Sequence, residues 1–255
     1  MEYTQEIDRI YEIQLDPSEL NGDLNLKPQS YQILYCKIAE IHLKSYNLGT
    51  DETMKYGVAW VLISLTIEIK TPIKGICTLY AKTWKSGLQG PYFRRDFVFE
   101  DEFGKIYFQG TSFSVLLNME TRKVCRDKKL PFFSLGVSGL NTTEGFPTWK
   151  HAYSKELDQS DIKMEICAKR KVENSFIDML GHVNNIRYSE FVYDAMDETQ
   201  IKALDKLSRL EIYFQSELRL GDTFTVSKSQ IDGKLCFRGQ NLNTKDTSFY
   251  TVMIF

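Results

Sequence analysis

Residues 177–188 read I-D-M-L-G-H-V-N-N-I-R-Y, a cluster of polar side chains directly before an apolar helical pattern. The stretch holds Asp178, His182 and two asparagines, in a chain with only three histidines. Asparagine is a favoured N-cap residue, so a turn and a helix cap would explain this pattern. A histidine and an aspartate beside the free N–H groups of a helix could instead move protons and stabilise a negative oxygen. The sequence on either side decides between these two interpretations.

A helix followed by strands is predicted in both halves of the chain. Residues 29–46 have apolar side chains at helical spacing, and Asn47-Leu48-Gly49 ends the pattern. Segments rich in β-branched and aromatic residues follow, at 58–70, 75–84, 94–101 and 107–118. After the quoted stretch, residues 184–196 are predicted to be helical, and strands are expected at 208–217, 221–230, 234–241 and 248–255.

The second half therefore repeats the order of the first. The phrase T-P-I-K-G-I-C-T-L-Y at 71–80 aligns with E-L-R-L-G-D-T-F-T-V at 217–226. Two copies of a helix and a four-stranded antiparallel sheet predict an α+β fold made by internal duplication. We expect a first repeat over 1–125, a linker rich in proline and glycine over 126–160, and a second repeat over 161–255.

Composition excludes several classes of protein. The net charge is −2 and the isoelectric point is about 6.0, which lacks the basic footprint of a nucleic-acid-binding protein. The longest apolar stretch, 58–69, is too short and too polar to cross a membrane. The acidic N-terminus does not resemble a signal peptide. The five cysteines are widely spaced without a C-x-x-C pair, which favours reduced thiols in a cytoplasmic protein and argues against a zinc site.

The pattern D-x-x-G-H-V-N-N-x-x-Y before a helix resembles the loop of hotdog-fold thioesterases. The duplication and the chain length resemble more specifically the bacterial acyl-acyl-carrier-protein (acyl-ACP) thioesterases, which are related to the plant plastid enzymes. Three short motifs resemble that family's first repeat, namely A-W-V-L (59–62), T-P-I-K-G (71–75) and T-W (83–84). The resemblance implies two tandem hotdog domains, each a sheet wrapped around a central helix. It also implies release of free fatty acid from acyl carrier protein in fatty acid biosynthesis, without a metal or another cofactor, by a monomer or homodimer.

Thioester hydrolysis needs an activated water or an attacking carboxylate, and donors for the developing oxyanion. By the resemblance, Asp178, His182 and Glu217 match the family's catalytic positions. Glu217 would act as base or nucleophile, His182 would polarise the carbonyl or shuttle a proton, and Asp178 would orient the loop or His182. Gly181, Val183 and Asn184 are expected to support the site. They belong to the loop and to the start of a helix near residue 183, whose first backbone amides are unpaired.

The sequence departs from the family at two positions. Where relatives commonly have an asparagine two residues before the histidine, this chain has Leu180, and where many have an aspartate six residues before it, this chain has Phe176. Asn184, Gln215 or Ser216 could replace the missing donor. The alternative functions are an acyl-CoA thioesterase and a non-catalytic acyl-binding protein, and a dehydratase is less favoured.

A histidine, a basic run and several aromatic residues can each be interpreted as structural or as functional. His42, in the helix of the first repeat, has no neighbouring carboxylate and no comparable loop, so that repeat is expected to be non-catalytic. The run T-R-K-V-C-R-D-K-K at 121–129 could dock an acidic carrier protein or be a solvated linker. Four aromatic residues could line an acyl tunnel or belong to the core, namely Trp60, Trp84, Phe97 and Phe113.

Overall fold

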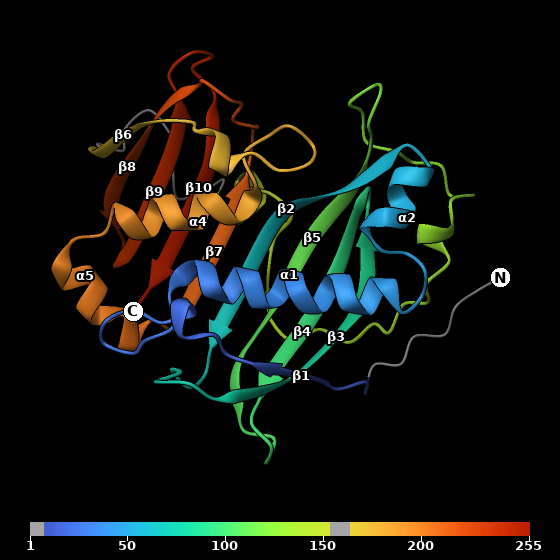
Figure 1. The fold of residues 1–255 in the computed structure, drawn as a ribbon, viewed down its shortest axis with the longest axis horizontal. Coiled ribbons are helices and arrows are strands. Elements are labelled where there is room, and N and C mark those ends of the chain that lie inside the picture. Colours follow the sequence, from blue (N-terminus) through green and yellow to red (C-terminus); the bar gives the residue numbers. More distant parts are fainter. Residues whose placement is uncertain (1–7, 154–163) are drawn as a thin grey trace.

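The computed structural model describes residues 8–153 and 164–255, which form one ten-stranded antiparallel sheet with helices packed against it (Figure 1). The first half contains β1 (Tyr11–Gln14), α1 (Pro28–Lys44), α2 (Thr50–Lys55), β2 (Val58–Ile69), β3 (Thr78–Gln89), β4 (Tyr92–Glu100) and β5 (Ile106–Asn118). The second half contains α3 (Trp149–Tyr153), β6 (Glu165–Lys171), α4 (Asn185–Asp194), α5 (Glu198–Lys202), β7 (Arg209–Phe214), β8 (Thr223–Ile231), β9 (Lys234–Asn241) and β10 (Thr247–Ile254). Short 3₁₀ helices span Pro17–Glu19, Pro131–Phe133, Asn174–Phe176 and Ala203–Lys206.

The two halves have the same topology. The strand order is β1-β3-β4-β5-β2 in the first half and, read inward from the other edge, β6-β8-β9-β10-β7 in the second. The innermost strands β2 and β7 pair antiparallel, with Leu65 opposite Ile212 and Ile67 opposite Leu210, and all four side chains are fully buried. Each half has one strand more than the four predicted, because β1 and β6 add an outer strand. The predicted boundaries at 125/126 and 160/161 stay predictions, and residues 154–163 lie outside the described part.

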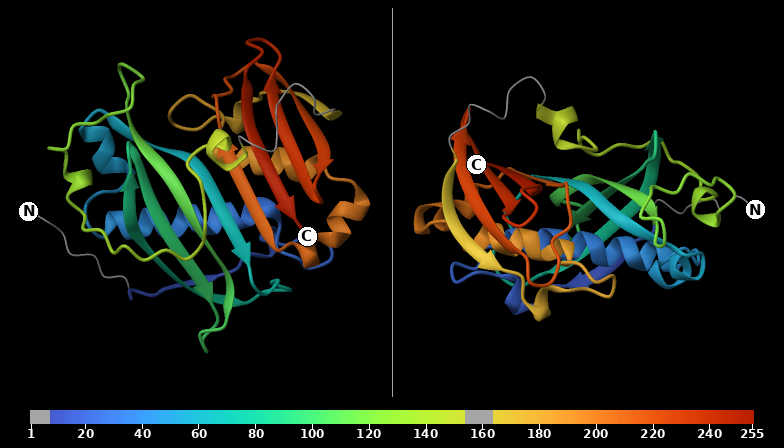
Figure 2. Two further views of the ribbon diagram at one scale, coloured as in Figure 1. Left: turned by 180° about the vertical axis from the view of Figure 1, so that it is seen from behind. Right: turned by 90° about the horizontal axis from the view of Figure 1, so that it is seen from above.

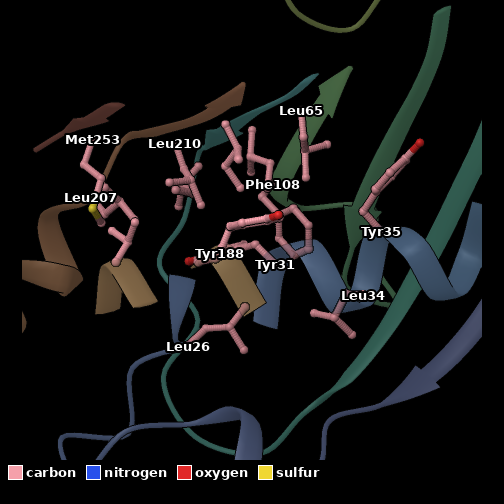
Figure 3. Close-up of a cluster of buried hydrophobic side chains, with 14 of the residues drawn as sticks. Leu26, Tyr31, Leu34, Tyr35, Leu65, Phe108, Tyr188, Leu207, Leu210 and Met253 are labelled. Carbon is pink, nitrogen blue, oxygen red and sulfur yellow. The ribbon is translucent and has the colours of Figure 1, made fainter. Parts of the chain in front are cut away.

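Both long helices cover the same face of the sheet (Figure 2, right). Tyr31 of α1 meets Phe108 of β5 edge to face, with ring centroids 5.0 Å apart. Figure 3 shows Tyr31 and Tyr188, one from each helix, between the helices and the strands. Across the contact of the two helices, Ser189 Oγ donates to Gln32 Oε1 at 2.7 Å. The helices therefore share one buried core with the joined sheet, and none of the described helices is long and apolar enough to cross a membrane.

The described part of the chain that connects the repeats, which ends at Tyr153, crosses the opposite face of the sheet (Figure 2). Ser64 Oγ of β2 donates to the carbonyl of Phe146 at 2.7 Å, and Gln109 Nε2 of β5 donates to the carbonyl of Thr142 at 2.8 Å. Trp149 stacks on Tyr250 of β10 with centroids 4.1 Å apart. Residues 142–153 of the predicted linker are thus packed onto the sheet by hydrogen bonds and aromatic contacts.

His42 of α1 is fully buried beside Arg95 of β4, and this position makes the fold sensitive to acid. Nη1 of Arg95 lies 3.1 Å from His42 Nδ1, and burial, Arg95 and Arg9 together lower the pKa of His42 to about 3. The pKa of a histidine in the unfolded chain is about 6.5. As the pH falls below that value, the unfolded chain binds a proton at His42, whereas the folded chain keeps the imidazole neutral. This contribution to stability is present above about pH 6.5 and is lost progressively toward pH 3.

We therefore expect His42→Gln, which keeps a hydrogen-bond acceptor, to reduce the loss of stability in acid. At pH 5 the proton linkage at His42 costs the wild type about 2 kcal/mol of unfolding free energy. Urea unfolding at pH 7 and pH 5 measures the difference. The control is His151→Gln, at an exposed histidine of α3, which should keep the wild-type pH dependence. Equal pH dependence for His42→Gln and wild type would contradict the assignment.

Candidate active site

A cleft of about 940 Å³ lies between the repeats and holds most of the predicted site residues. The second repeat contributes Asp178, His182 and Glu217, and the first repeat contributes side chains such as Trp60 and Arg122. Of the four aromatic residues considered for an acyl tunnel, Trp60 lines the cleft. Phe97 and Phe113 are buried in the interior, and the Trp84 side chain is mostly buried.

The structure brings His182 and Glu217 together. Nε2 of His182 lies 3.0 Å from Oε2 of Glu217. His182 lies in the loop before α4 and Glu217 follows β7, and the two segments are tied by a hydrogen bond from the Val183 amide to the Leu218 carbonyl, at 2.9 Å. Burial lowers the pKa of His182, although the Glu217 charge acts in the opposite direction. The imidazole is therefore neutral at neutral pH, and the arrangement assigns the Nε2 proton to a hydrogen bond with the carboxylate.

Arg122 completes this pair from the other repeat. It lies in the turn after β5, and its guanidinium forms an ion pair with Glu217 and lies 3.5 Å from His182 Nε2. Its backbone has φ of 56°, in the left-handed region. The sequence placed Arg122 only in the basic run at 121–129. Nothing in the pattern linked it to a carboxylate so distant in the chain.

Asp178 orders the loop that carries His182. Its Oδ1 accepts from the Leu180 amide at 2.8 Å, and its own amide donates to the His182 carbonyl at 2.9 Å. Gly181 has φ of +80°, which a glycine adopts without strain and which closes the turn. Of the two roles expected for Asp178, these contacts support orientation of the loop.

The N-terminus of α4 offers fewer free amides than expected, because the helix begins at Asn185. The Val183 amide is used by Leu218, and the Asn184 amide donates to the Phe176 carbonyl at 2.8 Å. Asn184 is the N-cap, and its side chain accepts from the Ile186 amide at 3.0 Å. Asn185, the first helical residue, lines the cleft, and its amide has no acceptor within the helix.

The proposed replacements for the missing family asparagine are mostly engaged elsewhere. Asn184 caps the helix, and Ser216 Oγ donates to the Thr247 carbonyl at 2.9 Å. Gln215 lines the cleft and makes one long contact, 3.4 Å from Nε2 to the Phe214 carbonyl. Leu180 itself is half-buried in the cleft wall. Arg122, by contrast, contacts both His182 and Glu217.

The first repeat contains the same loop without its chemistry, a likeness that the sequence analysis missed. The Asn21 amide donates to the Asn25 carbonyl at 2.9 Å, as the Asp178 amide does to His182. The bridge between Leu20 and Leu26 matches the one between Ile177 and Val183. Leu24 has φ of 61° where Gly181 has +80°. Asn25 therefore stands in the place of His182, and the strand alignment puts Thr71 in the place of Glu217.

Comparison with known proteins agrees with this architecture. Residues 4–129 match the acyl-ACP thioesterase N-terminal domain, and residues 159–249 match the acyl-ACP thioesterase C-terminal domain. Among curated proteins, no sequence matches. The structure is similar to an acyl-ACP thioesterase from Bacteroides thetaiotaomicron, with TM-score 0.79, 20% identity and 97% of each chain covered. It is also similar to the 12:0-ACP thioesterase from Umbellularia californica, with TM-score 0.73, 15% identity, and 96% of each chain covered.

These matches cover both halves of the chain and confirm the predicted α+β double-hotdog fold. The predicted family and the predicted class of enzyme, a thioesterase, are confirmed as well. The chain belongs to the acyl-ACP thioesterase family and is a hydrolase of fatty acyl-ACP thioesters.

Proposed function

We propose that the chain hydrolyses acyl-ACP at the His182–Glu217 pair. The observation that supports this assignment most directly is the 3.0 Å contact between the two side chains near the N-terminus of α4. A carboxylate and a neutral imidazole in one cleft supply a proton acceptor and a proton carrier. The amide of Asn185 and the Arg122 guanidinium supply donors for negative charge. The free fatty acid would be the product, in cytoplasmic fatty acid biosynthesis.

In the proposed reaction Glu217 removes a proton from a water molecule whose oxygen adds to the thioester carbonyl. The carbonyl oxygen becomes negative and is stabilised by the Asn185 amide and Arg122. The C–S bond then breaks as the Nε2 proton of His182 passes to the leaving sulfur, and the proton held by Glu217 replaces it on His182, which gives a carboxylic acid and a thiol. A direct attack by the Glu217 carboxylate would form an anhydride instead. Single-turnover hydrolysis in isotopically labelled water separates the two routes, because only the anhydride route puts an enzyme oxygen into the product.

The test of the function is hydrolysis of acyl-ACP over a range of chain lengths, with matched acyl-CoA substrates. Preferential release from the carrier protein supports the proposal. Equal or faster hydrolysis of acyl-CoA would favour the alternative of an acyl-CoA thioesterase. Tight binding of acyl chains without turnover would favour the non-catalytic protein for which Leu180 is the argument.

The basic run at 121–129 is a candidate docking site for the acidic carrier protein. Its first cation, Arg122, lines the active-site cleft, and exposed cations follow it in the chain. These are Lys123, Arg126, Lys128 and Lys129. In the described part of the chain none of these four is within ion-pair distance of a carboxylate. Opposite charges of this kind guide association, and salt weakens them over about 10 Å.

Reversal of Lys123, Lys128 and Lys129 to glutamate should raise KM for acyl-ACP by roughly tenfold at low salt, since the surface would repel an acidic partner. Hydrolysis of a short acyl-CoA should change much less. Steady-state kinetics at two ionic strengths measure both substrates. The control is Lys105→Glu, at an exposed lysine of the β4–β5 hairpin. Equal effects on both substrates, or none on either, would indicate a solvated linker.

A further inference from the structure

A second pocket, of about 160 Å³, lies mainly in the first repeat and shares part of its wall with the active-site cleft. The two cavities share lining residues, among them Cys36, Trp60, Leu62 and Asn185. The inner pocket also has apolar walls from Leu43, Phe93, Phe132 and Leu135. If the proposed function is correct, an acyl chain bound at His182 and Glu217 can extend past Asn185 into this pocket.

The inner pocket has a cation that an ordinary acyl chain does not need. Arg95 lines it, and among the described residues its guanidinium makes hydrogen-bond contacts with His42 Nδ1 at 3.1 Å and Thr83 Oγ1 at 3.4 Å. Neither partner carries a negative charge. Within residues 8–153 and 164–255, no carboxylate lies within 4.0 Å of this guanidinium.

The neighbouring arginine of β4, Arg94, has its positive charge neutralised by a carboxylate. Arg94 pairs with the buried Asp96, with 2.8 Å between Nε and Oδ2. Asp96 is therefore committed to Arg94, and it also accepts from the Thr142 amide at 2.8 Å. Arg95 is half-buried and is left with neutral partners, and a charge without a counter-ion is costly to the extent that it is buried.

Lys85 of β3 places a second cationic group at the same pocket. It is 4% exposed, and its Nζ donates to the Leu135 carbonyl at 2.7 Å. Burial and the nearby Arg95 lower its pKa to about 8, so it is mostly charged at neutral pH. The acid that lines the pocket, Glu40, binds the Thr50 amide and hydroxyl and lies 3.4 Å from Lys44. The uncompensated positive charge of the pocket is therefore that of Arg95, which an anionic group of a ligand would neutralise.

We propose that the inner pocket receives the far end of acyl chains that terminate in a carboxylate, with Arg95 as the group that binds it. A guanidinium offers a fork of N–H donors that matches the two oxygens of a carboxylate. The apolar walls hold the methylene groups between the two ends. The preferred substrates are thus half-acyl thioesters of dicarboxylic acids on the carrier protein.

The first experiment uses the wild-type protein and matched acyl-ACP pairs: octanoyl with the suberic half-acyl, decanoyl with the sebacic, and dodecanoyl with the dodecanedioic. At the best-fitting length we expect kcat/KM for the carboxylate-ended chain to exceed that for the methyl-ended chain by roughly 10-fold or more, as hydrogen bonds to a charged group allow. Methyl esters of the same diacids, which have the length without the charge, should lose this advantage. If methyl-ended chains are hydrolysed and carboxylate-ended chains have no higher kcat/KM at any length, the inference is overturned and the proposed function stays intact. No hydrolysis of either series would reject the proposed function itself.

The second experiment tests Arg95 by Arg95→Met. The ratio of kcat/KM for the carboxylate-ended over the methyl-ended chain should fall by roughly 10- to 100-fold. Arg170→Met removes an arginine that pairs with Asp194 outside the pocket, at 3.0 Å, and should keep the wild-type ratio. An unchanged ratio in folded Arg95→Met would remove Arg95 from recognition. If that variant does not fold, Arg95→Lys is used, and it should lower the ratio because it loses the two-pronged contact.

Discussion

Replacing Glu217 with glutamine should lower the turnover of acyl-ACP by roughly 10²–10⁴-fold, as expected for loss of a general base. Glutamine has nearly the shape of glutamate, but it cannot take a proton from water or attack the carbonyl. His182→Ala should cost a similar factor, because the imidazole that touches Glu217 at 3.0 Å is removed. Single-turnover hydrolysis measures the chemical step, and thermal melts report whether the variants fold.

Two positions outside the His182–Glu217 pair provide matched controls for this experiment. Thr71→Ala changes the position that aligns with Glu217, and His151→Ala changes an exposed histidine of α3, so both should keep wild-type turnover. If His182 and Glu217 act as one unit, the double variant should be little slower than the worse single variant. Wild-type rates in folded Glu217→Gln would exclude this carboxylate from the mechanism.

Periodicity and repetition predicted two α+β halves, the family resemblance supplied the hotdog fold, and the errors of the prediction have local causes. The strands β2 to β5 and β7 to β10 were predicted because their segments contain β-branched and aromatic residues and are separated by turn signals. The outer strands were missed because β1 has only four residues and β6, E-I-C-A-K-R-K, is polar and mostly exposed. The pairing of β2 with β7 could not be predicted, since each repeat alone contains no information about which strands meet at the centre.

From the residues alone, only the part of the site that lies in one continuous segment of the sequence could be predicted. The loop at 178–185 was visible because its polar residues are adjacent in sequence, and Glu217 was found by the family resemblance. Arg122 was not, because its role depends on a turn with φ of 56° that directs it across the repeat boundary. The equivalent loop at Asn21–Leu26 was hidden because hydrogen bonds repeat there while the residue types do not.

Arg122 has the geometry to take over part of the work of the amide that Leu180 cannot supply. It forms an ion pair with Glu217 and lies 3.5 Å from His182 Nε2, whereas Leu180 has no side-chain donor in the same cleft. In other enzymes one well-placed oxyanion donor is worth about 2.7–4 kcal/mol of barrier. If Arg122 fills that place, the two positions are coupled, and single substitutions alone give a misleading picture.

We expect Arg122→Met to lower single-turnover hydrolysis by roughly 10²–10³-fold, because it removes a charged donor beside the reacting carbonyl. Leu180→Asn alone should raise the rate only slightly, since the guanidinium already occupies that role, and its half-buried position limits the loss of stability to about 1–3 kcal/mol if the amide finds no partner. In the Arg122→Met background the same Leu180→Asn change should recover a large part of the lost rate. The coupling free energy comes from the four single-turnover rates, with thermal melts as the check on folding. Strictly additive effects would show that Arg122 and residue 180 serve different steps, and a faster Arg122→Met enzyme would show that the arginine blocks Glu217 instead of assisting it.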